Sequence, residues 1–254
     1  MFVGTEGIGK KLIAKEFAKM ILCTDENKYC GKCKSCIEFE SSNNPDFKII
    51  EPDGNSLKIE QIREFQNKVS EKPIISNRKV YIINDSDKMT TEAQNCLLKT
   101  LEEPPEHVKF ILATTEPQKL PATILSRCQR FDFKRISNED IIKRLEIVCK
   151  ESNIEISEGA LKIIAVLAEG AMRDALSILE RCVQDGENKI DEDKIKDLVG
   201  IPKITYVHSI VEAIAEYDID KALSSMDEIL NQGKDLNNFL WEIIKYVKDV
   251  LIYK

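Results

Sequence analysis

The pattern of apolar and polar positions changes near residue 136. Before that point, short apolar runs of strand length alternate with segments whose apolar residues recur every three or four positions, as in amphipathic helices. The predicted strands end at residue 3 and cover residues 47–50, 79–83, 108–113 and 130–133. The predicted helices cover residues 12–22, 59–69 and 91–103. Strands that alternate with helices favour an α/β domain built on a parallel sheet.

From residue 137 the strand pattern ceases and only helical periodicity continues. Ser137 and the polar residues after it are typical of a helix start. The predicted helices cover residues 138–150, 157–168, 172–183, 191–199, 206–215, 219–230 and 236–253. Gly200 and Pro202 indicate a boundary inside this part. We therefore predict an α/β plus all-α chain with three domains, at residues 1–135, 136–200 and 201–254.

Both ends of the sequence look cut. Only three residues precede a glycine-rich loop, although the strand before such a loop normally lies inside a sheet. The last predicted helix has an apolar face that continues almost to residue 254, and a face of this kind needs a partner. Either the chain is a fragment or another subunit supplies the missing surface, so we expect the third domain to be incomplete.

The glycine-rich loop at residues 4–10 has the form G-x-x-G-x-G-K and predicts a phosphate site. Gly4, Gly7 and Gly9 let several backbone N–H groups face one phosphate, and Lys10 reaches the outer phosphates. The next residue is Lys11, where a Ser or Thr would bind magnesium. Since a lysine cannot ligate a metal ion, the loop is suited to holding phosphate and poorly equipped to hydrolyse it.

Two further segments lie where this kind of sheet binds its ligands. Asn84 and Asp85 follow the strand at residues 79–83, at the position of the acidic residues that order magnesium and the attacking water in P-loop enzymes. Asn84 is neutral and Asp85 is short, so the pair indicates a weakened inherited site as well as a helix cap. Thr114 and Thr115 follow the next strand, at the carboxyl end where α/β sheets bind ligands.

Cys23, Cys30, Cys33 and Cys36 lie close together in the segment at residues 23–36. Four thiolates at this spacing suit a structural, tetrahedral Zn²⁺ with bonds of about 2.3 Å. The other interpretation is four free or regulatory thiols. The remaining cysteines stand in apolar contexts and are predicted to be core residues: Cys96, Cys128, Cys149 and Cys182.

Composition limits the possible functions. The chain has 254 residues, 43% hydrophobic and 32% charged, and its formal net charge of −7 argues against strong DNA binding by this chain alone. Any contact with nucleic acid is therefore expected to be local or shared within an assembly. There is no run of 18 apolar residues and no secretory signal peptide, so we expect no membrane span and a cytoplasmic location.

Some polar residues carry no chemical signal by themselves. From spacing alone, Arg127 is better interpreted as a surface charge than as a phosphate ligand. Arg173 stands near the start of a predicted helix and is unremarkable there. His107 and His208 are far apart in the sequence, and neither is assigned a role.

Taken together, the motifs resemble those of AAA+ clamp-loader subunits of bacterial DNA polymerase III. The resemblance rests on the loop at residues 4–11, the cysteine insertion, Leu-Glu-Glu-Pro-Pro at 101–105, Ser-Arg-Cys at 126–128 and Gly-Ala-Met-Arg-Asp at 170–174. It implies an AAA+ P-loop domain with a zinc module, a helical lid domain and a C-terminal helical collar domain for oligomerisation.

The resemblance also implies roles for residues. Arg127 matches the arginine finger that acts in the ATP site of a neighbouring subunit. Thr114 or Thr115 matches the sensor 1 residue, and Arg173 matches sensor 2. The implied zinc ligands are Cys23, Cys30, Cys33 and Cys36. The implied nucleotide site is degenerate, binds ATP weakly or not at all, and consists of Gly4, Gly7, Gly9, Lys10, Thr115 and Arg173.

The departures from the family pattern favour the delta-prime, or stator, type of subunit over its near relative, the tau/gamma motor type. Lys11 and Asn84 remove two magnesium ligands, whereas Arg127 is kept. The expected function is to help load the sliding clamp on primed DNA, without intrinsic ATPase activity, as part of the polymerase III holoenzyme. The expected partners are the tau/gamma and delta subunits, the clamp and primer-template DNA.

Two other functions remain open. One is a divergent motor subunit of the tau/gamma type that hydrolyses ATP with Lys10, Asp85 and Arg173. The other is a zinc-stabilised AAA+ adaptor outside replication.

Overall fold

A computed structural model of the chain describes residues 1–26, 28–184, 189–200, 204–231 and 236–253. These residues fall into two compact units. The first consists of Met1–Ile136 and a short segment from later in the chain, Ala171–Arg173. The second consists of Ser137–Gly170 and the described residues from Asp174 onward. Each unit is considered by itself.

The first unit is built on a five-stranded parallel sheet with the strand order β2-β3-β4-β1-β5. Although β1 stands at the very start of the sequence, it lies inside the sheet, where Phe2 is paired with Ala113 on one side and Phe131 on the other. The strands are β1 (Phe2–Val3), β2 (Phe47–Ile50), β3 (Lys79–Ile83), β4 (Val108–Thr114) and β5 (Phe131–Asp132). The prediction of an α/β unit with a parallel sheet is therefore confirmed.

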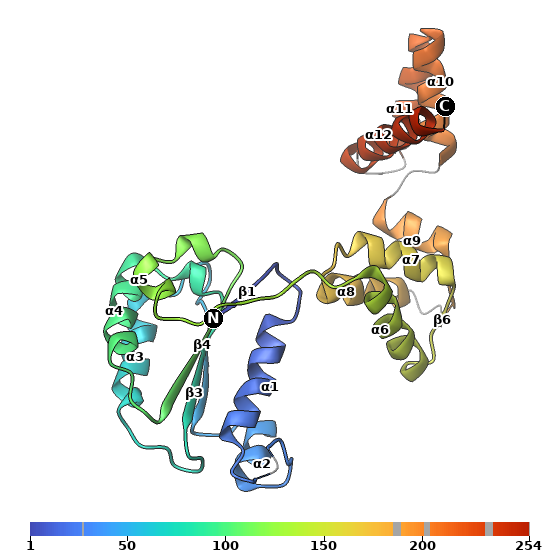
Figure 1. Cartoon of the computed structure of the whole chain (residues 1–254). Helices are drawn as coiled ribbons and strands as arrows, with labels where there is room; N and C mark the ends of the chain where they lie inside the picture. The colour runs from blue at the N-terminus through green and yellow to red at the C-terminus, as the bar shows by residue number, and fades with distance from the viewer. Residues whose placement is uncertain (27, 185–188, 201–203, 232–235, 254) are drawn as a thin grey trace. The chain divides into compact units, whose positions relative to one another are not determined.

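Helices cover both faces of this sheet (Figure 1). On one face α1 packs against apolar residues of β1, β3 and β4, and on the other face α3, α4 and α5 enclose a second core around Phe65 and Leu97. The helices are α1 (Lys10–Leu22), α2 (Lys34–Glu40), α3 (Ile59–Val69), α4 (Thr91–Glu102) and α5 (Ala122–Leu125). The apolar stripes of the longer helices therefore face the sheet, as their periodicity predicts.

Two helices of this unit were not predicted, and one ends earlier than predicted. The short α2 and α5 have too few turns to show a helical period in the sequence. Helix α4 begins after Thr90, whose hydroxyl accepts a hydrogen bond from the N–H of Ala93, and ends at Glu102 rather than at residue 103. Glu103 precedes a proline, and that position disfavours helical backbone angles.

The second unit begins with four helices and a small parallel sheet of β6 and β7. The hydroxyl of Ser137 caps α6 by accepting a hydrogen bond from the backbone N–H of Asp140, and that of Ser157 caps α7 by accepting one from the N–H of Ala160. The elements are α6 (Asn138–Glu151), β6 (Glu155–Ile156), α7 (Glu158–Leu167), α8 (Met172–Val183), β7 (Lys189–Ile190) and α9 (Glu192–Val199). The prediction that strands cease after residue 137 is wrong, because two-residue strands are too short to show a period.

The last described elements are α10 (Ile204–Glu216), α11 (Ile219–Asn231) and α12 (Leu236–Ile252). Val207, Ile210 and Phe239 form a small buried cluster between α10 and α12. Several apolar side chains on α12 are exposed: Leu240, Trp241, Ile244, Val247, Val250, Leu251 and Ile252. No helix in the described part of the chain has both the length and the apolar character needed to cross a lipid bilayer.

Candidate functional site

A cavity of about 470 Å³ lies beside the N-terminus of α1, where β2, β3 and β4 end. The loop before α1 and the residues that follow these three strands form its wall. The lining residues are Glu6, Gly7, Gly9, Lys10, Lys11, Leu12, Glu51, Asn84, Asp85, Thr115 and Arg173. Ligands of open α/β sheets bind at this edge, and the N-terminus of a helix favours anions, so the cavity is a candidate phosphate site.

Backbone geometry around the loop explains its glycines. Gly7 and Gly9 have φ angles of 73° and 96°, which side-chain-bearing residues rarely adopt. A Cβ on Gly7 would also lie 2.9 Å from the Cβ of Ala171. Gly4 has another role, since it does not line the cavity and a Cβ there would lie 2.9 Å from Phe133. Gly7 and Gly9 shape the phosphate loop, whereas Gly4 allows the loop to leave the sheet.

Lys10 is the first residue of α1 and is largely buried. Its ammonium group donates hydrogen bonds of 2.8 Å to the carbonyl oxygens of both Gly4 and Thr5. Burial lowers the pKa of Lys10, and the nearby carboxylates of Asp85 and other acidic residues oppose that shift. The lysine is thus held inside the loop by neutral acceptors that a phosphate can replace.

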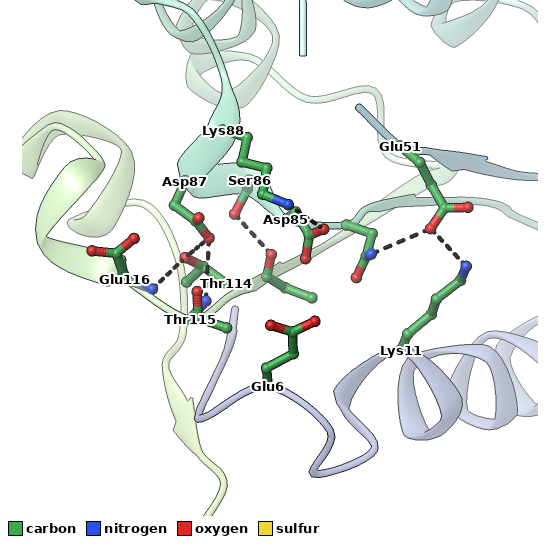
Figure 2. Close-up of polar contacts among 12 residues, drawn as sticks. Glu6, Lys11, Glu51, Asp85, Ser86, Asp87, Lys88, Thr114, Thr115 and Glu116 are labelled. Carbon is green, nitrogen blue, oxygen red and sulfur yellow. Dashed lines mark hydrogen bonds and ion pairs between the residues drawn. The ribbon is translucent and has the colours of Figure 1, made fainter. Parts of the chain in front are cut away.

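Lys11 belongs to a small network that the sequence did not indicate. Its Nζ lies 2.6 Å from Oε1 of Glu51, and the same oxygen accepts a hydrogen bond of 3.2 Å from Nδ2 of Asn84. Figure 2 shows the contact between Lys11 and Glu51. Glu51 and Asn84 directly follow Ile50 and Ile83, which are paired between β2 and β3, so the sheet places them side by side.

Magnesium, which P-loop enzymes use, does not fit this arrangement. Mg²⁺ requires an octahedral set of oxygen ligands. At the two positions expected to supply a hydroxyl and a carboxylate, Lys11 and Asn84 instead direct an ammonium group and an amide N–H at Glu51. The lysine brings a positive charge to the place where the cation would bind, so the two would repel each other.

The two candidate threonines at the end of β4 differ in whether a ligand can reach them. Asp87 accepts hydrogen bonds from the hydroxyl of Thr114 and from the backbone N–H of Thr115 (Figure 2). Thr114 is fully buried, whereas Thr115 lines the cavity. Asp85 precedes a 3₁₀ turn with a left-handed backbone, but its side chain makes no capping hydrogen bond. Thr115 is therefore the threonine available to a ligand.

The two candidate arginines lie in different places. Arg173 lines the cavity, with one guanidinium nitrogen 3.0 Å from a carboxylate oxygen of Glu6. Arg127 does not line it; its guanidinium contacts Glu102 at 3.1 Å and the carbonyl oxygen of Thr123 at 2.8 Å. The structure thus brings Gly7, Gly9, Lys10, Thr115 and Arg173 together and leaves Arg127 outside this site.

The four clustered cysteines meet between the end of α1 and the start of α2. All four sulfur atoms lie within 4.8 Å of one another, without a disulfide. Sulfur-to-sulfur distances from Cys23 are 3.6 Å to Cys30 and 3.9 Å to Cys33. A tetrahedron with Zn–S bonds of about 2.3 Å has edges of about 3.8 Å. The cluster, completed by Cys36, therefore has the dimensions and the donor type that a zinc ion requires.

The thiols of this cluster differ in acidity. Burial disfavours the thiolate at Cys33, but hydrogen bonds from Thr24 and Cys36 lower the pKa of Cys33 to about 5. Burial and the hydrogen bond to Cys33 raise the pKa of Cys36 to about 12. At neutral pH one proton is therefore retained between these neighbours, and a zinc ion would have to displace it, since zinc binds thiolates.

The remaining cysteines and histidines lie elsewhere. Cys149 and Cys182 are buried, as predicted for core residues, whereas Cys96 and Cys128 are only half-buried against the core. Nε2 of His107 contacts the backbone carbonyl oxygens of Val69 and Glu71 at the end of α3 and just after it, and Nδ1 of His208 lies 3.1 Å from the hydroxyl of Tyr246. None of these residues lines the cavity.

Comparison with protein families gives two matches along the chain. A family model described as "DNA polymerase III, delta subunit" matches residues 1–137, more than half of the chain. A second, described as "DNA polymerase III clamp loader subunit, ATPase lid domain", matches residues 140–188. The first match ends and the second begins close to the boundary between the two compact units.

Several curated relatives are similar over almost the whole chain. DNA polymerase III subunit tau of Bacillus subtilis is 38% identical over 257 residues, which cover 100% of this chain and 45% of the relative. The gamma subunit of Buchnera aphidicola (subsp. Schizaphis graminum) is 37% identical, with 99% of this chain and 69% of the relative covered. Subunit tau of Escherichia coli is 37% identical, with 96% and 38% covered. The chain thus spans less than half the length of the two tau relatives.

Among solved structures, the Holliday junction branch migration motor RuvB of Thermotoga maritima has a TM-score of 0.55 to this chain. The sequence identity is 14%, and the match covers 95% of this chain and 78% of RuvB. A single-residue variant of the same RuvB gives a TM-score of 0.56 with the same identity and coverage. This likeness shows a shared fold, with a parallel P-loop sheet and a helical C-terminal part.

Proposed function

The chain belongs to the DNA polymerase III clamp-loader subunits, which have the AAA+ type of P-loop fold, and from this premise we propose that it is a nucleotide-binding subunit of the tau/gamma type. The tau and gamma relatives, similar over nearly the whole chain, support this type. The sequence alone favoured the delta-prime type over the tau/gamma type, and the similarity to tau and gamma subunits reverses that preference.

The observation that carries nucleotide binding is the cavity at the P-loop. It places the phosphate loop, the N-terminus of α1 and the side chains of Lys10, Thr115 and Arg173 around one space. Two cations and a helix N-terminus favour a polyphosphate, because each stabilises negative charge. The nucleotide's outer phosphates would contact Lys10 and Arg173, and Thr115 would hydrogen-bond from the end of β4.

The contacts of Lys11 support binding without efficient hydrolysis. Phosphoryl transfer in P-loop proteins relies on a metal ion that bridges the phosphates and neutralises the developing charge. Lys11 supplies no oxygen ligand at one of the two positions expected to hold that ion, and Asn84 supplies only a neutral amide at the other. We therefore propose that the chain holds a nucleotide and contributes to the assembly without turning over ATP by itself.

A stator of the delta-prime type is the second candidate. It is favoured by the same altered metal position at Lys11 and Asn84. In that role the nucleotide site would be unused, and Arg127 would act on the ATP site of a neighbouring subunit. Nucleotide binding distinguishes the two candidates.

Further features of the sequence prediction belong to this proposal. The partners would be other clamp-loader subunits, with the sliding clamp and primer-template DNA contacted in the assembly. Cys23, Cys30, Cys33 and Cys36 would hold a structural zinc ion. The domains would be a P-loop domain at residues 1–135, a lid at 136–200 and an oligomerisation collar from 201 onward.

The test measures nucleotide binding and steady-state ATP hydrolysis by the purified chain. A fluorescent ADP analogue should bind, and Lys10→Ala should abolish binding, because Lys10 is the buried cation of the loop. Lys15→Ala, which removes a charge from the same helix outside the cavity, should leave binding intact. With magnesium, ATP turnover should not exceed that of Lys10→Ala.

Each opposing result has a clear meaning. No detectable binding by the unaltered chain would contradict the proposal and favour the stator. Turnover near 1 per second that disappears in Lys10→Ala would be at the low end of ordinary enzymes. It would make the chain a motor subunit and contradict the proposed lack of hydrolysis.

A further inference from the structure

The cavity differs from a magnesium-dependent phosphate site in the source of its positive charge. Lys10 and Lys11 are consecutive at the start of α1, and both line the cavity. Their side chains take different paths: Lys10 bonds to carbonyl oxygens within the loop, whereas Lys11 crosses to Glu51 at the end of β2. The site therefore has a second ammonium group on the side where a metal ion would be expected.

Lys11 is free to change partner. Its side chain is 42% exposed and that of Glu51 is 45% exposed. Water therefore screens the attraction between the two charges, and the ion pair is weak. The lysine side chain is long and flexible, with three donors at its tip. A phosphate group bound at the loop would carry more negative charge than one carboxylate, so the ammonium group could move from Glu51 to the phosphate.

Glu51, which also accepts a hydrogen bond from Asn84, keeps Lys11 within reach of the cavity. It does not compete strongly with a ligand for the ammonium group of Lys11. The oxygen that accepts from Lys11 also accepts from Asn84, so part of its hydrogen-bonding capacity is already used. The backbone N–H of Asn84 is fixed by the carbonyl oxygen of Ile50, which anchors this contact on the sheet. Lys11 is therefore positioned before a ligand arrives.

From these contacts we propose that the cavity binds a nucleoside di- or triphosphate without a divalent cation, with the ammonium group of Lys11 in the place of the metal ion. This inference rests on the nucleotide binding proposed above and adds the chemical form of the ligand, the metal-free polyphosphate anion. Lys10 binds one side of the phosphate chain, and Lys11 neutralises the side that magnesium covers in other P-loop proteins.

The experiment compares nucleotide affinity with and without magnesium. Isothermal titration calorimetry with ADP, and with the non-hydrolysable triphosphate AMP-PNP, is performed in excess EDTA and in excess Mg²⁺. For the unaltered chain, the dissociation constant in EDTA should be no more than about threefold weaker than in Mg²⁺. Lys11→Thr should weaken binding in EDTA by about tenfold or more, because a charged hydrogen bond to phosphate is lost.

Two variants make the comparison specific. Lys11→Thr combined with Asn84→Asp supplies the hydroxyl and the carboxylate that a metal ion needs, so its binding should become at least about tenfold tighter in Mg²⁺ than in EDTA. Lys15→Thr removes a charge one turn further along α1, outside the cavity, and should behave like the unaltered chain. Thermal unfolding of each variant shows whether it is folded.

The outcomes separate this inference from the proposed function. Binding by the unaltered chain that needs Mg²⁺ would overturn the metal-free mode and leave nucleotide binding in place. Equal loss of affinity in Lys11→Thr and Lys15→Thr would remove the special role of Lys11. No binding in either condition would overturn both this inference and the proposed nucleotide binding.

Discussion

Lys10 and Lys11 show how two identical neighbouring residues acquire different roles. Both stand at the positive end of the α1 dipole, where another cation is unfavourable. Lys10 is tolerated because carbonyl oxygens of the loop surround it, and Lys11 because Glu51 lies opposite. The sequence predicted that Lys11 would not bind a metal ion. It did not predict Glu51, which is 40 positions away and meets Lys11 only through the sheet.

Arg127 is the residue whose proposed role lies outside its own site. Its guanidinium contacts Glu102 and a backbone carbonyl oxygen, and both contacts are exposed. If the chain is the stator of the second candidate function, Arg127→Ala in an assembly with tau/gamma-type subunits should lower ATP turnover at the neighbouring site by about 100-fold, because a lost transition-state donor has that effect. The stability of the chain should change by less than about 0.5 kcal/mol.

Arg130→Ala is the matched control for this substitution. Arg130 is an exposed arginine three residues away and is paired with Asp132. Its removal should leave turnover of the assembly unchanged. Equal turnover in the Arg127→Ala and unaltered assemblies would show that Arg127 is the surface charge that its spacing alone indicated.

At the scale of elements, the site is produced by the carboxyl ends of three neighbouring strands. β2, β3 and β4 are adjacent and parallel, so the residues after them form one edge. The sequence located β2 and β3 with their observed bounds, and β4 and β5 to within one residue at each end. It could not give their order, because strand pairing depends on contacts between distant parts of the chain. The order is what places Glu51 beside Asn84.

The cysteine segment is an element that a metal ion should hold together. It connects the end of α1 to α2, and its thiols converge without a disulfide. Protein purified under reducing conditions should contain about one zinc per chain by elemental analysis. Cys33→Ser should lose most of this zinc and lower the melting temperature by at least about 5 °C, since binding energy at such sites contributes to folding.

Cys96→Ser is the control for the cysteine segment. Cys96 lies in α4, away from the cluster, and its sulfur contacts Gln66. A serine there should retain the zinc content of the unaltered chain. Substantially less than one zinc per chain in the unaltered protein would instead support free or regulatory thiols.

At the scale of the whole molecule, many described apolar side chains on the helices from α10 onward are exposed. Phe239 is buried against α10, whereas Trp241 is 68% exposed and Leu251 is 70% exposed. Large exposed apolar surfaces mark interaction sites. The exposure of these side chains agrees with the expectation that the apolar face of the last helix needs a partner.

Replacing part of this surface should weaken assembly. Ile244→Glu combined with Val247→Glu places two charges one turn apart on the exposed face of α12. The dissociation constant for a tau/gamma-type partner subunit, measured by analytical ultracentrifugation, should rise by at least about tenfold, because both charges would be desolvated. Lys248→Glu, at an exposed polar position of the same helix, should have little effect. Equal affinity in all three proteins would exclude this face from the interface.

The sequence by itself determined the features that depend on neighbours in the chain. Periodicity located most helices, and the glycine and cysteine spacings identified the phosphate loop and the candidate zinc ligands. These signals are local, because a helix repeats every 3.6 residues and a loop or metal module is made of consecutive segments. The same local view missed β6 and β7, whose two-residue strands exist only through mutual pairing.

Only the tertiary structure decided which distant residues share the site. It placed β1 inside the sheet, selected Thr115 over the buried Thr114, and brought Glu51 to Lys11. Each result depends on strand order and register, which arise from burying apolar faces across the whole unit rather than from any local pattern. The sequence therefore specified the chemical groups, and the packing of the sheet brought Lys11 into an ion pair with Glu51 beside the cavity.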